Sequence, residues 1–310
     1  MSLTDNRQVI MKKLKFDHLG HLLNSALKKW YSRDPFRESA IIAYNAIFSL
    51  PGLLIVVLTL AGYFFGADAV SGRLHKQIAE AMGNDTADQV QSMVLMATKS
   101  RDSLTATIIG IITILIGATG VFVEMQKSLN IIWEVKATTA KSGVWAILKT
   151  RLFSFGLIIS IAFLLLVSLV LSSLVSALGA WFQNHWSESF RIMFRVMNFV
   201  FSIAVITILF AMMFKTLPDA KIKWHFVWIG AFVASLLFVL GKFALGLYFG
   251  TVNPGSGYGA AGSVILILIW TSYSSMIVFF GAEFTKVYSD YHYGEVAPTM
   301  NAVKQKGRVG

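Results

Sequence analysis

A single lysine interrupts one of the most apolar stretches of the chain. Residues 235–250 read SLLFVLGKFALGLYFG, in which Lys242 is the one charged residue. A lysine at the centre of a membrane span costs about 2.5–3.5 kcal/mol on insertion, and the cost falls toward the membrane surface. The amine either faces a cavity, where it would bind an anionic ligand, or reaches the outer surface, where Asp68 is the best-placed acidic partner. The sequence leaves both interpretations open.

Three acidic residues form a second group of candidates. Glu38, Glu124 and Glu283 stand at the predicted inner ends of three membrane spans. Each has a basic residue close to it in sequence, and these are Arg37, Lys127 and Lys286. The pattern predicts ion pairs that close or gate one end of a helix bundle, and proton coupling through the carboxyl groups is the alternative.

Two of the apolar stretches also contain hydroxyl, amide and aromatic side chains. They read AYNAIFSLPG, in which Pro51 favours a helix kink, and IWTSYSS, which falls near the predicted middle of the bilayer. Polar groups at that depth need hydrogen-bond partners or water. They predict a network between helices or a wet groove, and both can hold together. The candidates for a cavity or substrate path are Tyr44, Asn45, Ser49, Lys242, Trp270, Ser272 and Tyr273.

No pattern in the sequence indicates catalysis. The six histidines are scattered, cysteine is absent, and no phosphate-binding loop, nucleophile elbow or zinc-protease motif occurs. Metal-dependent hydrolysis needs clustered carboxylates or histidines that hold ions and activate water. We therefore expect no enzyme, no catalytic residues, no metal site and no cofactor.

Membrane helices are the elements that must position these residues. Of the 310 residues, 55% are hydrophobic and only 14% are charged. Soluble proteins carry about a quarter charged residues, so this deficit indicates lipid as the solvent. A helix needs about 20 apolar residues to cross a bilayer. Six stretches qualify, at 39–66, 105–123, 152–180, 196–214, 226–249 and 260–284. The expected fold class is all-α, a polytopic bundle of about six transmembrane helices, with five spans as the alternative.

Basic residues predict the orientation of the chain. The flanks and loops on one side hold 20 Lys and Arg residues and those on the other side hold six. Since Lys and Arg are enriched in cytoplasmic loops, both termini are expected in the cytoplasm of a bacterium, with the chain multi-pass in its inner membrane. The net charge of +11 then reflects these loops, and we expect no nucleic-acid partner.

The predicted segments fall into three parts. Residues 1–38 are a cytoplasmic segment whose LGHLLNSALKKW has the spacing of an amphipathic helix, lying at the membrane interface or packed on the loops of the bundle. Residues 39–290 are the six-span domain, with an outer helical hairpin at 67–104. Residues 291–310 are expected to be a disordered cytoplasmic tail.

Small residues indicate where the spans pack together. Ser168, Ser172 and Ser176 recur at intervals of four residues, and Gly246 and Gly250 are a pair of small residues with the same spacing. Such positions let helix backbones approach in lipid, so we assign them a structural role. The glycine-rich GTVNPGSGYGAAG before the last span predicts a tight outer turn, with an anion site at the helix N-terminus as the alternative.

Three sequence blocks resemble a known family. RDPFRESAIIAYNAIFSLPG, GVFVEMQKSLNIIWEVK and YGAAGSVILILIWTSYSSMIVFFGAEFTKVY are similar to the YihY/BrkB family of bacterial inner-membrane proteins, and the similarity runs from about residue 30 to 290. The resemblance implies an integral inner-membrane protein of about six spans. Its members are linked to serum resistance and are proposed as transporters, including of lipids or envelope glycolipids, and some carry the older name ribonuclease BN.

Two classes of function remain after these exclusions. A transporter of lipids or other amphipathic anions would line a groove with the polar candidates, use no ATP-binding motif, and take a phospholipid or glycolipid as substrate. A membrane scaffold of the cell envelope would instead saturate those groups with one another. The lipid bilayer is a partner in both cases, and a homo-oligomer is left open.

Overall fold

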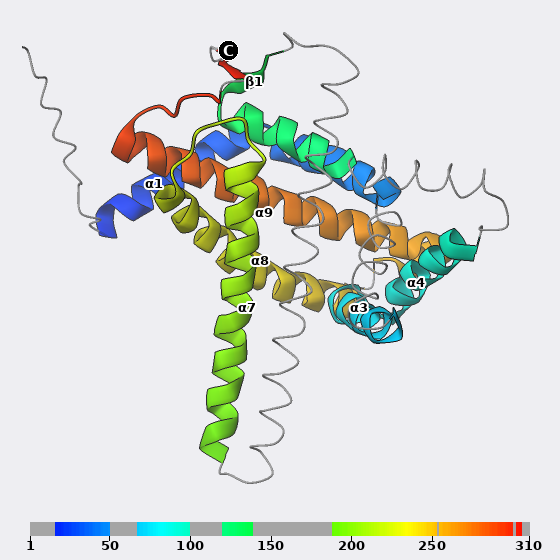
Figure 1. Cartoon of the computed structure of the whole chain (residues 1–310). Coiled ribbons are helices and arrows are strands. Elements are labelled where there is room, and N and C mark those ends of the chain that lie inside the picture. The colour runs from blue at the N-terminus through cyan, green and yellow to red at the C-terminus, as the bar shows by residue number, and fades with distance from the viewer. Residues whose placement is uncertain are drawn as a thin grey trace, which may run out of the picture.

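The computed structural model describes residues 16–49, 67–99, 120–138, 188–252, 254–299 and 302–305. These parts of the chain are helical apart from short turns and one two-stranded sheet (Figure 1). The predicted spans 105–123 and 152–180 lie almost wholly outside them, as do Pro51, Ser168, Ser172 and Ser176.

The named elements follow one another along the chain as helices with two short strands. They are α1 (Phe16–Ser32), α3 (Ala67–Met82), α4 (Asn84–Lys99), β1 (Val135–Ala137), α7 (Glu188–Thr216), α8 (Trp224–Val252), the 3-10 helix η1 (Ser256–Ala261), α9 (Gly262–Tyr293) and β2 (Ala302–Lys304). Residues 35–49 and 120–132 are also helical.

Three of the described helices are long and apolar enough to cross a bilayer. They are Phe199–Thr216 within α7, all of α8 and all of α9. They coincide with the last three predicted spans, because an uninterrupted apolar run of this length can only satisfy its backbone in lipid as a helix. The total of six spans stays a prediction.

Helix α8 packs against both α7 and α9, and its contact with α9 depends on two glycines. A Cβ at Gly230 would overlap the Thr285 side chain, and one at Gly241 would overlap the Tyr273 hydroxyl group. Because the earlier glycine of α8 meets the later residue of α9, and the later glycine the earlier residue, the two helices run antiparallel. Figure 1 shows α7 crossing this pair, with the first half of α7 extending away from the other labelled helices.

Gly246 and Gly250, the small-residue pair predicted from the sequence, make no close contact with the described residues. A Cβ at Gly246 or Gly250 would meet nothing within 4 Å. The spacing alone identified two glycines on one face of the helix, but the crossing point with α9 selects Gly230 and Gly241, which stand eleven residues apart.

Helix α1 lies against the C-terminal half of α9 and fastens the N-terminal segment to the bundle. Leu22 and Ala26 are buried against Phe284 and Tyr288 of α9, while Lys28 is exposed. Trp30 also donates a hydrogen bond from Nε1 to the carbonyl oxygen of Met276. The apolar face of α1 therefore packs on α8 and α9, two helices long and apolar enough to cross a bilayer, rather than on loops.

Helices α3 and α4 form a hairpin over the far end of α8 and α9, in the segment predicted as one. Gly83 joins them with a φ of 91°, a left-handed conformation that glycine adopts without strain. Gln89 of α4 accepts a hydrogen bond from Ser263 at the start of α9.

A small antiparallel sheet of β1 and β2 covers the other end (Figure 1). Val135 pairs with Lys304, and the bridge between Ala220 and Pro298 holds the intervening chain to the α7–α8 connection. The prediction of a disordered tail is therefore wrong for residues 302–305, because their backbone groups find partners in the 134–137 segment.

Candidate functional site

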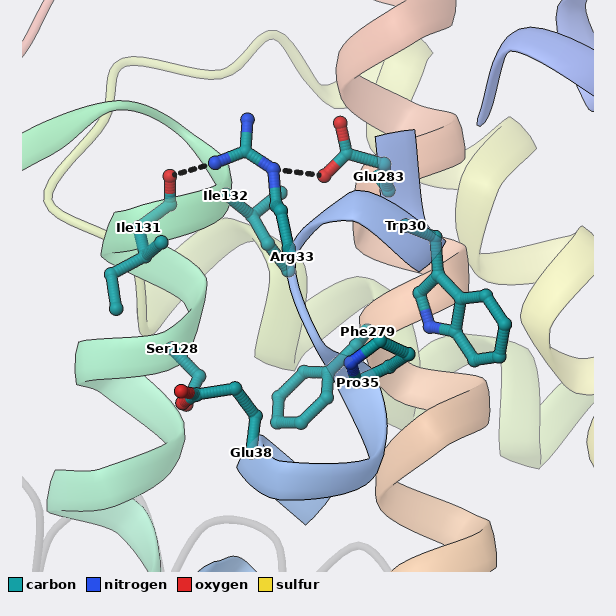
Figure 2. Close-up of a pocket in the computed structure, with 9 residues that line it drawn as sticks. All are labelled: Trp30, Arg33, Pro35, Glu38, Ser128, Ile131, Ile132, Phe279 and Glu283. Carbon is teal, nitrogen blue, oxygen red and sulfur yellow. Dashed lines mark hydrogen bonds and ion pairs between the residues drawn. The ribbon is translucent and has the colours of Figure 1, made fainter. Parts of the chain in front are cut away.

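The turn after α1 carries the residue that joins three separate segments. Asp34 has a φ of 54°, and this left-handed turn sends the chain from α1 into the helix at 35–49. Arg33 donates from Nη1 to the carbonyl oxygen of Ile131 at 2.8 Å and from Nη2 to Glu134 Oε1 at 3.0 Å. Its Nε lies 3.0 Å from Glu283 Oε2 (Figure 2).

Glu134 lies in the turn between the helix at 120–132 and β1. Its φ of 55° is unusual for a residue with a side chain, and its carbonyl oxygen accepts a hydrogen bond from Gln305 at 2.8 Å. Its carboxylate contacts Arg33 and also Lys286, whose Nζ lies 3.1 Å away. Partial burial by itself raises the pKa of Glu134, but the hydrogen bonds and charges of Lys286 and Arg33 outweigh it and leave the pKa below its ordinary value.

Glu283 is the most buried of these charged groups. Its exposed fraction is 0%, and it lies on α9 one turn before Lys286. The contact with Arg33 lacks the alignment of a hydrogen bond, and neither carboxylate oxygen has a hydrogen-bond partner among the described residues. A buried carboxylate in this state is costly, because nothing replaces the water that it loses.

Lys286 extends the group along α9. Its side chain is 8% exposed, and besides Glu134 it reaches Asp290 Oδ2 at 3.2 Å. We refer to Arg33, Glu134, Glu283, Lys286 and Asp290 as the charge cluster. It joins the turn after α1, the end of the helix at 120–132 and the C-terminal half of α9, three segments far apart in sequence.

A small pocket adjoins the charge cluster. Figure 2 shows Trp30, Pro35 and Phe279 forming its apolar side, with Glu38 and Ser128 opposite. Its other lining residues are Arg33, Ile131, Ile132 and Glu283. The cavity volume of this pocket is about 20 Å³. This space admits one ordered water molecule and is far too small for a lipid.

Asn130 and Asp219 hold the helix that supplies Glu134. The Asn130 amide donates to Asp219 Oδ2 at 2.8 Å and its oxygen accepts from the Asp219 backbone N–H at 2.8 Å. This pair fixes the helix at 120–132 to the α7–α8 connection and so keeps its last turn in place beside Arg33.

The predicted ion-pair residues divide between the cluster and its surroundings. Glu283 and Lys286 are in the cluster. Glu38 lines the pocket and contacts Arg37 and Ser128, each at 3.0 Å. Glu124 pairs with Lys127 at 2.6 Å. The side chain of Asp68 lies outside what the structure describes.

The sequence analysis did not identify Arg33, Glu134 and Asp290 as site residues. Arg33 is the first residue of one family block and one of the counted basic residues, and Glu134 lies in the second family block. The one local signal is Asp290, which follows Lys286 by four residues on a helix, a spacing that brings opposite charges together.

The candidate path residues are spread over different contacts. Tyr44 is 62% exposed and makes an edge-to-face ring contact with Phe48 of its own helix. Ser272 shares a hydrogen bond of 2.9 Å with Ser39, whereas Tyr273 packs over Gly241. The remaining candidates take other neighbours, with Trp270 against Phe238, and Asn45 and Ser49 facing Gly120.

Lys242 lies on the exposed side of α8. It stands beside the apolar residues Leu240 and Phe243, which are 67% and 69% exposed. No hydrogen bond or ion pair connects it to another described residue.

Comparisons with known proteins place the chain among membrane proteins. A family model described as Virulence factor BrkB matches residues 26–306. A UPF0761 membrane protein of Saccharophagus degradans is 22% identical over 94% of this chain and 67% of its own length. A UPF0761 membrane protein of Pseudoalteromonas atlantica is 25% identical over 85% and 84%. A protein of Bacillus subtilis named as ribonuclease-like, YfkH, is 27% identical over 84% and 93%. No solved structure matches the chain.

Proposed function

The chain belongs to the virulence factor BrkB family, and we propose that it is a bacterial inner-membrane transporter for lipids or other amphipathic anions. The proposal includes both termini in the cytoplasm, as the Lys and Arg distribution predicts. The charge cluster then lies at the cytoplasmic end of the bundle and the α3–α4 hairpin at the outer end.

The observation that carries this proposal is the exposed position of Lys242. An ammonium group on the apolar face of a membrane-length helix is rare, because its insertion is costly. A phosphate or carboxylate headgroup would offset that cost, since a hydrogen bond to a charged group contributes about 1.5–3 kcal/mol. Lys242 is thus suited to meet an anionic lipid from the membrane side.

The pocket at the charge cluster supports a path along the helix surface rather than through the described interior. Its cavity volume of about 20 Å³ is enough for a water molecule, whereas pockets that bind small ligands have volumes of roughly 300–1,000 Å³. We place the acyl chains against the exposed face of α8, which presents Trp228, Phe232 and Leu240.

A reconstitution experiment tests the proposal. The probe is fluorescent phosphatidylglycerol in vesicles that contain the purified protein, with fluorescent phosphatidylcholine as the uncharged comparison. Lys242→Met should slow phosphatidylglycerol translocation about tenfold, the equivalent of about 1.4 kcal/mol, while Lys242→Arg retains it. Lys136→Met, which removes an exposed lysine on β1, is the matched control. Equal rates for Lys242→Met and the parent protein contradict the proposal.

One observation favours a non-catalytic membrane scaffold as the second candidate. The Ser39–Ser272 hydrogen bond and the packing of Tyr273 on Gly241 use polar groups for helix contacts. A scaffold is favoured if wild-type vesicles translocate both probes no faster than protein-free vesicles.

The name of the Bacillus subtilis relative makes a nuclease a third class to test. Metal-dependent hydrolysis needs ligand clusters that the sequence does not display. Among the residues that the structure describes, no three His, Asp or Glu side chains come together in a metal-binding group. We propose a role without catalysis, which divalent-metal-dependent cleavage of RNA by the purified protein would contradict.

A further inference from the structure

The charge cluster contains one carboxylate too many. Within the ion pairs of the cluster, Arg33 and Lys286 supply two positive charges, whereas Glu134, Glu283 and Asp290 supply three negative ones when all are ionised. Lys29 also acts on Glu283, but it is exposed and forms no described ion pair with it. A charge left without a counter-charge is tolerated at a wet surface but is expensive when it is buried. One proton bound by a carboxyl group would balance the cluster.

Burial decides which of the three carboxyl groups takes that proton. The side chains of Glu134 and Asp290 are 34% and 26% exposed, and Glu134 has two cationic partners. Glu283 is 0% exposed and has one cation within 4.0 Å, without hydrogen-bond alignment. It is the least solvated and least compensated member of the cluster.

Charged groups face Glu283 from four segments. Lys29 and Arg33 on and after α1 and Lys286 on α9 favour the carboxylate, and Glu134 disfavours it. Glu38 from the helix at 35–49 lines the same pocket, and Asp290 lies farther along α9.

Helices α7 and α8 contribute no described charge at this level of α9. They pack there with Phe214 and Ala234 against Gly281 and with Gly230 against Thr285. The nearest titratable residue of α8 is His225, beside Phe226 and toward Tyr288.

The pocket provides a route for the proton. Glu283 and Glu38 both line it, and the space of about 20 Å³ admits a water molecule between solvent and the carboxyl group. We infer that Glu283 is a proton-binding site, which takes a proton from solvent through this pocket and releases it when the carboxylate pairs with Arg33.

Protonation changes what holds α1 to α9. A neutral Glu283 loses its charge attraction to Arg33, which keeps its bonds to Glu134 and the Ile131 carbonyl oxygen. The turn after α1 then keeps its bonds to the helix at 120–132 and loses its charge contact with α9, while Trp30 stays hydrogen-bonded to Met276. This inference stands independently of the proposed lipid transport, because it concerns the protonation state of one side chain.

Difference infrared spectroscopy of the full-length protein in lipid nanodiscs tests the inference. The carbonyl stretching band of a protonated carboxylic acid is followed as the pH is raised over the range in which the protein stays folded. We expect a band that disappears with rising pH, is absent in Glu283→Gln, and persists in Glu124→Gln. Glu124 is the matched control because its carboxylate is 27% exposed and already paired with Lys127.

A second variant keeps the test decisive if Glu283→Gln fails to fold. Arg33→Gln removes the nearest counter-charge, so the band should persist to a pH about one to three units higher. The inference is overturned if the band is missing from the wild type, if it survives Glu283→Gln and is lost in Glu38→Gln, or if Arg33→Gln leaves it in place.

Discussion

The two ends of the α8–α9 pair treat polar residues in opposite ways. At one end, Glu283 is fully buried and charged side chains from three segments surround it. At the other end, Lys242 is exposed among apolar side chains without a described partner. The difference shows that a charge in an apolar helix has no single meaning, because its role depends on whether other segments cover it.

The same contrast appears in the glycines of α8. Gly230 and Gly241 lie where the helix meets α9, and Gly246 and Gly250 lie where the described structure leaves open space. Substitution of Gly230 or Gly241 is therefore expected to disturb the packing, whereas Gly246 and Gly250 are expected to tolerate it.

Removal of the Arg33 side chain should give the largest effect. Arg33→Ala breaks the contacts with Glu134, Glu283 and the Ile131 carbonyl oxygen, and removing one partner of a buried ion pair typically costs about 3–5 kcal/mol. The cost is largest at a pH where Glu283 is ionised in the wild type. Thermal unfolding of the protein in nanodiscs measures this as a lower melting temperature. Arg37→Ala, which removes a side chain that is 69% exposed, should leave the melting temperature unchanged. Similar losses in both variants would show that the cluster is no tighter than a surface ion pair.

A methyl group at the helix crossing should have the next largest effect. Gly241→Ala forces Tyr273 out of its position and should lower the free energy of unfolding by about 1–3 kcal/mol. Gly246→Ala is the control on the same helix and should not destabilise, since nothing lies within 4 Å of the added carbon. If Gly246→Ala is the more harmful change, the close helix contact of α8 lies at Gly246 rather than at Gly241.

The pH dependence of stability should reveal Glu134. Because its folded pKa is lowered by Lys286 and Arg33, its stabilising contribution is complete above the ordinary glutamate pKa and is lost as the pH falls through the lowered value. Melting temperatures measured across this acidic range should fall less steeply for Glu134→Gln than for the wild type. Parallel profiles would mean that Glu134 has the same pKa in the folded and unfolded protein.

Lys242→Met should change stability least of all. The amine has no described ion pair to lose, and methionine suits an apolar helix face, so the melting temperature should stay the same or rise slightly. A marked fall would show that Lys242 has a partner in the folded protein and would remove the contrast between the two ends.

The sequence predicts the long helices well and the contacts between them poorly. Continuous apolar runs define α8 and α9 because the length of such a run reports directly on the bilayer that it must cross. The sequence also predicts Glu283 and Lys286 as ion-pair residues, since charged residues at the end of an apolar run are unusual. Arg33 and Glu134 were missed because each sits in a turn, and neither turn indicates by itself which distant segment it will face.

Composition, hydropathy and basic-residue asymmetry by themselves determined that this protein is helical and belongs in a membrane, because these properties depend on the solvent and on local backbone hydrogen bonding. The tertiary structure alone decided that Arg33 meets Glu283, that Gly241 rather than Gly246 lies against α9, and that β2 returns to β1. Such pairings join residues up to 250 positions apart, Arg33 and Glu283 among them. They follow from the shapes of packed surfaces, which no local pattern in the chain encodes.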